Sequence, residues 1–140
     1  MKRSKYNVSS DKSDRTFNNI VFHTVGECNR YKALLLAMRD GLIRDISLQP
    51  KFKIYLNGIY ICQYIADFRY KTVTEFEGIP PETEVIDDFK GVHTNVFKLK
   101  AKLFKAHFPH LHLVLSGKGG TRKRSSKRQR RKKNAVEQLK

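Results

Sequence analysis

The chain has 140 residues, with 29 Lys and Arg against 13 Asp and Glu, and a formal net charge of +16. This length is typical of a single domain. No run of residues approaches the ~18 to 20 apolar positions that a membrane helix needs, and the N-terminus lacks the apolar core of a secretion signal. Cys28 and Cys62 are too few for a disulfide framework or a four-cysteine zinc site. We therefore expect a protein of a reducing interior that is neither secreted nor inserted in a membrane.

The positive charge is concentrated at the two ends of the chain. Residues 117–140 contain eleven basic residues and one acidic residue, whereas residues 17–116 contain thirteen basic and ten acidic residues. Residues 1–16 are polar and lack apolar periodicity. Dense like charge without an apolar stripe favours disorder. The sequence predicts a flexible basic arm over residues 1–16, a folded domain over residues 17–116 and a disordered basic tail over residues 117–140.

The first predicted element is a helix over residues 25–39. Thr24 and Glu27 have the spacing of a capping box, in which Thr24 caps the helix and Glu27 reaches back to the cap. Cys28, Tyr31, Leu35 and Met38 then form one apolar stripe. Asp40 and Gly41 supply the stop, because glycine accepts the left-handed conformation at a helix end.

Strands are predicted to follow this helix. Apolar and polar residues alternate over 51–56, and the Asn57-Gly58 dipeptide predicts a tight turn into a partner strand over 59–70. A third strand is predicted over 83–90. Thr94 then caps a second helix over 95–107, and residues 110–115 form a short last strand. This order of helix, three strands, helix and strand predicts an α/β domain with a mixed sheet.

Three residues of the predicted strands suggest chemistry: Asp67, Asp88 and Lys90. Asp88 and Lys90 point to the same side of their strand because strand side chains alternate, and Asp67 lies beside them if the two strands pair. Two adjacent carboxylates are costly to ionise without a cation, and oxygen ligands favour Mg²⁺. A neighbouring lysine can orient a water or stabilise charge on a phosphate. The alternative is that the Asp-x-Lys pattern is a solvated edge or an ion pair.

The order of these residues resembles a known superfamily. Glu27 on the first helix, Asp67 on the second strand and Asp88-Phe89-Lys90 on the third are similar to the PD-(D/E)xK nucleases, which include restriction enzymes and Holliday-junction resolvases. More closely, residues 22–31, 48–52, 64–68 and 87–91 resemble a phage and prophage family of small proteins called domain of unknown function 1064. The resemblance extends over residues 20–115.

The resemblance implies a restriction-endonuclease-like α-β-β-β-α-β core, with a small mixed sheet flanked by helices. It also implies that Asp67 and Asp88 hold Mg²⁺, with Mn²⁺ as a substitute, that Lys90 is the catalytic lysine, and that Glu27 completes the site directly or through water. Ala66 stands where a proline often precedes the first aspartate. Asp87 stands where a glutamate is more usual, and alternation places it on the opposite face, so we assign it no catalytic role.

Basic side chains are the candidates for DNA contact. Lys98, Lys102 and Lys105 form a basic stripe on the second helix, with Lys100 off it, although such a stripe is equally typical of a solvated helix face. Gln49 is a weaker candidate, and a loop residue with a backbone contact is its alternative reading. The tail contributes nine basic residues: Arg122, Lys123, Arg124, Lys127, Arg128, Arg130, Arg131, Lys132 and Lys133.

The predicted function is that of a Mg²⁺-dependent, phage-type DNA endonuclease acting on duplex or branched DNA in the cytoplasm of a bacterial host. A homodimer is expected if it cuts two strands. The alternative is a non-enzymatic nucleic-acid-binding protein, because a basic tail gives sequence-independent affinity to either class. In a eukaryotic context the basic run over 122–133 would also fit a nuclear-localisation signal.

Overall fold

The computed structural model describes residues 11–117. A 3₁₀ helix, η1 (Ser13–Arg15), precedes two α-helices, α1 (Val25–Arg39) and α2 (Asn95–His107). The strands are β1 (Thr16–Phe17), β2 (Ile20–Val21), β3 (Ile43–Leu48), β4 (Lys51–Leu56), β5 (Ile59–Ile65), β6 (Phe68–Thr72), β7 (Glu84–Phe89) and β8 (His112–Ser116). None of the helices within residues 11–117 is long and apolar enough to cross a membrane.

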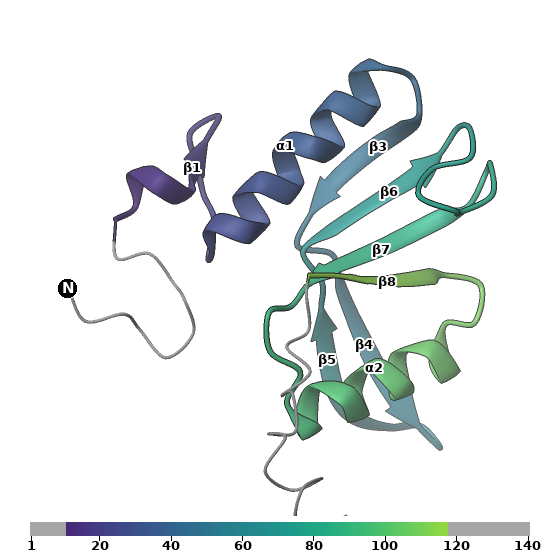
Figure 1. Ribbon diagram of the computed structural model, residues 1–140. Coiled ribbons are helices and arrows are strands. Elements are labelled where there is room, and N and C mark those ends of the chain that lie inside the picture. The colour runs from purple at the N-terminus through teal and green to yellow at the C-terminus, as the bar shows by residue number, and fades with distance from the viewer. Residues whose placement is uncertain (1–10, 118–140) are drawn as a thin grey trace, which may run out of the picture.

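The main sheet has four strands in the order β3-β6-β7-β8. The β3–β6 and β6–β7 pairs are antiparallel and the β7–β8 pair is parallel, so the sheet is mixed. The predicted α/β class with a mixed sheet is therefore confirmed. Strands β4 and β5 form a separate two-stranded hairpin. In Figure 1, α1 lies along one side of the sheet, and α2 lies against the hairpin on the other.

Both α-helices have the predicted bounds, and their caps explain why. The hydroxyl oxygen of Thr24 accepts a hydrogen bond from the Glu27 amide at 3.1 Å, and that of Thr94 accepts one from the Phe97 amide at 3.1 Å. The buried face of α1 differs from the predicted stripe. Cys28 and Tyr31 of the stripe belong to the core, but in the later turns Leu34 and Ala37 are buried in place of Leu35 and Met38, of which Met38 is 41% exposed.

The strand predictions need two corrections. The single strand expected over 59–70 is two strands, because the chain leaves the hairpin at Ala66 and Asp67 and enters the main sheet as β6. Strand β3 was not expected: its alternation is broken where Asp45 adopts a positive φ of 59° and the register shifts between Arg44 and Ser47. Five strands, rather than three, therefore lie between the two helices.

The ends of the chain were assigned to an arm and a tail. Residues 13–16 of the expected arm form η1 and the start of β1, and β1 pairs with β2. Residues 1–10 of the arm lie outside the described residues. Residues 118–140 also lie outside them, and with them all nine basic residues singled out in the tail.

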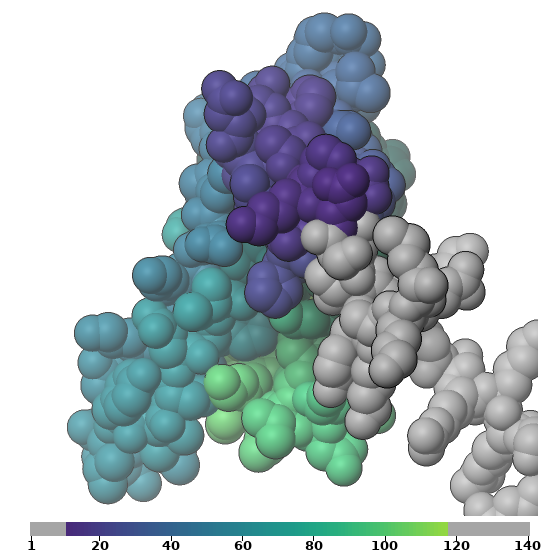
Figure 2. All heavy atoms as spheres, turned by 90° about the vertical axis from the view of Figure 1, so that its left-hand side faces the viewer, coloured from purple at the N-terminus to yellow at the C-terminus, as the bar shows by residue number. Residues whose placement is uncertain are grey.

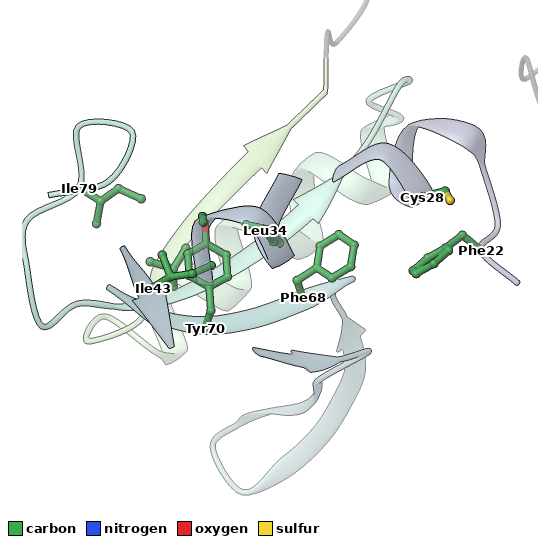
Figure 3. Packing of buried hydrophobic residues seen from close by; sticks show 9 residues of the cluster. Phe22, Cys28, Leu34, Ile43, Phe68, Tyr70 and Ile79 are labelled. Atoms are coloured by element: carbon green, nitrogen blue, oxygen red, sulfur yellow. The ribbon is translucent and has the colours of Figure 1, made fainter. Parts of the chain in front are cut away.

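The sheet separates two hydrophobic clusters. Figure 3 shows the first, in which Leu34 of α1 lies between Phe68 and Tyr70 of β6. The second joins α2 and the hairpin to the other face and includes Phe104 and Ile86. Alternation along β7 therefore directs Val85 towards α1 and Ile86 towards α2. The two aspartates that follow them are directed to opposite faces in the same way.

Candidate active site

Asp67 lies at the junction between the hairpin and the main sheet. Its amide donates to the Asp87 carbonyl oxygen at 3.1 Å, and its carboxylate oxygen Oδ2 accepts from the Phe89 amide at 2.7 Å. These two bonds tie Asp67 to both ends of the segment that contains Asp88. The structure thus brings the two predicted aspartates together, although 20 residues of sequence separate them.

Asp88 is fully buried on β7. Its Oδ2 accepts a hydrogen bond from the Tyr64 hydroxyl at 2.6 Å, and burial, together with the Asp88 charge, raises the pKa of Tyr64, which keeps the phenol protonated. Its Oδ1 is also buried but has no hydrogen-bond partner among the described residues. Lys90 Nζ lies 3.6 Å from this oxygen, close enough for an ion pair but beyond a hydrogen bond.

The environment of Asp67 disfavours a negative charge. Burial, together with repulsion from Glu27 and Asp88, raises the pKa of Asp67 to about 8, against the lowering effect of the Phe89 amide. Neighbouring carboxyl groups that repel each other in this way do not ionise together without a cost in free energy. A cation placed between them would remove that conflict.

Glu27 lies in the first turn of α1 and faces the same pocket as Asp67. Its Oε2 accepts from the His23 amide at 3.3 Å, so the side chain reaches one residue beyond the Thr24 cap to which it was expected to return. Burial raises the pKa of Glu27, with the amide and charge of His23 acting in the opposite sense. Glu27 therefore binds the backbone just before its own helix and also forms, with Asp67 and Asp88, an acidic site.

The residues present fit a hard divalent cation. Within residues 11–117, no group of three or more His, Cys, Asp or Glu side chains is arranged to hold a metal on its own. Mg²⁺, however, is usually held by one or two carboxylates together with waters and substrate phosphates. Asp67 and Asp88 supply those two carboxylates, and the unpartnered Oδ1 of Asp88 is a buried acceptor that lacks a positive partner within hydrogen-bond distance.

A pocket of about 280 Å³ lies beside Asp88 and Lys90 and is also lined by Lys100 and Phe97 of α2. Lys90 Nζ lies 5.6 Å from the centre of the Phe97 ring. Lys98, Lys102 and Lys105, the predicted stripe, are exposed on α2 and are not among the residues that line this pocket. Lys100, which the sequence left off the stripe, is the α2 lysine nearest to the candidate chemistry.

Tyr64, Lys100 and Arg30 are site residues that sequence reasoning missed. Tyr64 lies three residues before Asp67, a spacing that places two side chains on opposite faces of an extended strand, so the alternation pattern does not indicate it. Gln49, the weaker candidate, lines the pocket with Glu27 and Asp67, and its amide donates to the Asp67 carbonyl oxygen at 2.9 Å. The backbone contact expected for Gln49 as a loop residue is therefore present, and its role in DNA contact stays a prediction.

Asp87 belongs to a network on the α1 face of the sheet. Its Oδ2 accepts from Arg30 Nε at 2.9 Å and from Arg30 Nη2 at 2.7 Å, and its other oxygen accepts from the Ser116 hydroxyl. Arg30 also forms an ion pair with Glu77 at 2.7 Å. Nothing local in the sequence indicates a pair 57 residues apart. The network fixes α1 to β7, which positions Glu27 near Asp67.

Comparison with known proteins places the chain in a family. A search of the curated proteins and a search of the solved structures found no match. The model of the family described as "Protein of unknown function (DUF1064)" matches residues 3–123. That match extends over most of the chain and includes every residue of the acidic site. The chain belongs to this family of proteins of unknown function.

Proposed function

We propose that the protein is a metal-dependent DNA endonuclease of the PD-(D/E)xK type. The observation that carries this proposal is the buried pair of Asp67 and Asp88, with one Asp88 oxygen unpartnered and Lys90 Nζ 3.6 Å from it. Such an arrangement is costly to fold, and a cation with a phosphate ligand would offset that cost. The net charge of +16 gives the molecule affinity for a polyanion.

The order of elements supports the proposal. Without the β4–β5 hairpin, the chain order of the main sheet and its helices is α1, β3, β6, β7, α2, β8. This order agrees with the α-β-β-β-α-β order that the superfamily resemblance implies. Asp67 precedes its second strand, and Asp88 lies on its third, two residues before Lys90. The superfamily pattern expects the first acid on the second strand, and Asp67 lies one residue before that strand. It expects the second acid and the lysine on the third strand, where Asp88 lies with Lys90 just beyond the strand's end.

Each residue has a role consistent with phosphodiester hydrolysis. Asp67 and Asp88 would hold Mg²⁺ or Mn²⁺, with Glu27 assisting directly or through water, and the ion would supply charge neutralisation and water activation. Lys90 can stabilise negative charge developing on the phosphate or orient a water. Tyr64 holds Asp88 in place through its hydroxyl. Lys100 places a second positive charge in the same pocket.

A non-enzymatic DNA-binding role would explain the basic tail but not these acids. Carboxylates that face DNA weaken its binding unless a cation lies between the carboxylates and the phosphate, because like charges repel. A binder would have no use for Asp67 and Asp88 side by side under the surface. The acidic site therefore favours the nuclease, and branched DNA, a dimeric state and a phage role in a bacterial host remain parts of the proposal.

A cleavage panel tests the proposal directly. Single-stranded, duplex, flap and four-way-junction DNA are incubated with the protein and Mg²⁺, with EDTA as the metal-free reference. We expect cutting that EDTA abolishes and that Asp88→Asn or Lys90→Ala lowers by at least ~10²-fold. Asp45→Asn and Lys71→Ala are matched controls, because both residues lie away from the site in surface ion pairs and should leave the rate unchanged. Equal cutting by Asp88→Asn and the parent would contradict the assignment.

A further inference from the structure

A second pocket lies on the Glu27 side of the acidic site. It has a volume of about 280 Å³, and Glu27 and Asp67 line it together with Arg15, His23 and Gln49. The lining of the pocket thus combines carboxylates with basic side chains. Neither Arg15 nor His23 has a role in the proposed cleavage.

Arg15 is built into the pocket by the N-terminal segment. Its Nη1 donates to the Phe22 carbonyl oxygen at 2.7 Å, and its own carbonyl oxygen accepts from the Phe22 amide at 2.8 Å. The β1–β2 pairing of Thr16 with Val21 fixes the same segment. The guanidinium is therefore held in one place rather than free to move over the surface. Figure 1 shows this segment beside the beginning of α1.

The guanidinium of Arg15 has capacity for another ligand. Its Nε is buried and has no hydrogen-bond partner among the described residues. Each of the other four arginines within residues 11–117 forms an ion pair with a carboxylate: Arg30, Arg39, Arg44 and Arg69. No carboxylate in that part of the chain forms such a pair with Arg15. A buried, unused donor on a charged group calls for an acceptor that the protein itself does not supply.

We propose that this pocket binds a backbone phosphate of DNA, next to the phosphate that is cut, through Arg15 and with His23 at its rim. A phosphate in the pocket would accept a charge-assisted hydrogen bond from the Arg15 guanidinium, whose charge no carboxylate of residues 11–117 neutralises through an ion pair. The pocket beside Lys90 and Lys100 lies at Asp88, and the Arg15 pocket lies at Asp67. One strand that occupied both pockets would pass over the acid pair between them. The inference rests on the proposed function for the identity of the ligand.

Salt dependence of DNA binding separates this role from a structural one. Binding of a short fluorescent duplex is measured in EDTA over a range of salt concentrations, so that no cleavage occurs whatever the enzyme does. Each phosphate contact contributes about 0.9 to the slope of log affinity against log salt. We expect Arg15→Gln to reduce the slope by about 0.9, with affinity lowered about tenfold at low salt. Arg15→Lys should keep the slope, because the charge remains.

Arg39→Gln is the matched control. It removes the same charge from the opposite end of α1, where Arg39 is exposed and pairs with Asp40 at 3.6 Å, so its slope should equal that of the parent. A lower melting temperature for Arg15→Gln with an unchanged slope would show that Arg15 only anchors Phe22, and would overturn the inference. Absence of DNA binding by the parent would overturn it as well. If the parent cut none of the DNAs in the panel but Arg15→Gln still reduced the salt slope, the nuclease proposal would be rejected and the phosphate site would be kept.

Discussion

The buried carboxyl groups of the acidic site lower the stability of the fold. Asp67 accepts the Phe89 amide with one oxygen, and Asp88 accepts the Tyr64 hydroxyl with one of its own. The remaining electrostatic conflict between them is reflected in the pKa of Asp67, which burial and the neighbouring acids raise to about 8. Residues retained for function commonly lower stability in this manner. Metal binding and stability should therefore depend on pH in a linked way.

We predict that the metal-free protein loses stability as pH rises from about 4 to about 8. An unfolded aspartate releases its proton near ~3.9, whereas folded Asp67 keeps it until about 8. Between these values the folded state binds more protons, so the free energy of unfolding falls with rising pH. Asp67→Asn should remove this part of the decline and stabilise the protein at pH 8 by about 1 kcal/mol or more. Urea unfolding of both proteins at pH 5 and pH 8, in EDTA, measures it.

Mg²⁺ supplies the complementary measurement. Added at pH 8, it should raise the unfolding midpoint of the parent and not that of Asp67→Asn, since a ligand stabilises the state that binds it. Asp45→Asn is the control for charge alone, because Asp45 is an exposed side chain outside the site. If the free energy of unfolding of Asp67→Asn fell with pH as much as that of the parent, in EDTA, the raised pKa would not belong to Asp67.

At the scale of elements, the site depends on how closely α1 approaches the end of β7. Arg30 of α1 binds Asp87 of β7, and Gly26 in the first turn of α1 lies against the ring of Phe89 at the end of β7. A Cβ atom on Gly26 would lie 2.2 Å from Cε1 of Phe89, far inside van der Waals contact. A side chain at residue 26 would have to displace the Phe89 ring for the first turn of α1, which includes Glu27, to keep its position.

Substitution of Gly26 by alanine tests this contact. Alanine should stabilise an unconstrained helix interior by up to ~1 kcal/mol relative to glycine, so any destabilisation measures the clash with Phe89. We expect Gly26→Ala to lower the free energy of unfolding by ~1 to 3 kcal/mol. Phe89→Leu made together with Gly26→Ala should recover part of that loss, and a double-mutant cycle by urea unfolding gives the coupling. Additive effects of the two changes would show that the two residues do not meet.

The predictable elements are those fixed by local signals. Thr24 and Thr94 mark both helix starts because a cap acts within three residues of its own position. The break at Ala66 and Asp67 has no such signal, because apolar and aromatic residues lie on both sides of it and pairing with β7 is what moves the chain into the main sheet. Strand β3 was missed because its bulge disrupts the alternation on which strand prediction depends.

At the scale of the molecule, the candidate site lies where distant segments meet. Glu27, Asp67 and Asp88 come from α1, the β5–β6 junction and β7, so their proximity follows from the sheet and could be expected from sequence only through the family resemblance. Arg15 and Lys100 carried no comparable pattern and were not indicated. Figure 2 shows the N-terminal segment, the β4–β5 hairpin and α2 on one face of the molecule. A nucleic acid could therefore contact all three from one side.

The C-terminal end of the described chain lies at this site. Gly117 has a φ of 140°, and a Cβ atom there would lie 2.7 Å from the Lys90 carbonyl oxygen. The Ser116 hydroxyl, one residue earlier, donates to Asp87. Gly117 therefore lies against the backbone of Lys90, and a truncation meant to remove only residues 118–140 must keep it. Gly117 precedes the segment of eleven basic residues at positions 118–140 and itself lies beside the backbone of the proposed catalytic lysine.

We predict that a chain ending at Gly117 binds DNA more weakly and with a much smaller salt slope but keeps its turnover rate. The removed segment has a net charge of +10, and the slope falls by about 0.9 for every phosphate that the shortened chain no longer neutralises. Interactions that are equal in the ground and transition states change KM and leave kcat unaltered. Steady-state cleavage and salt titrations of the two chains measure both quantities. A fall in kcat at saturating DNA, with an unchanged melting temperature, would instead place part of the tail in the reaction, because only an interaction made in the transition state lowers that rate.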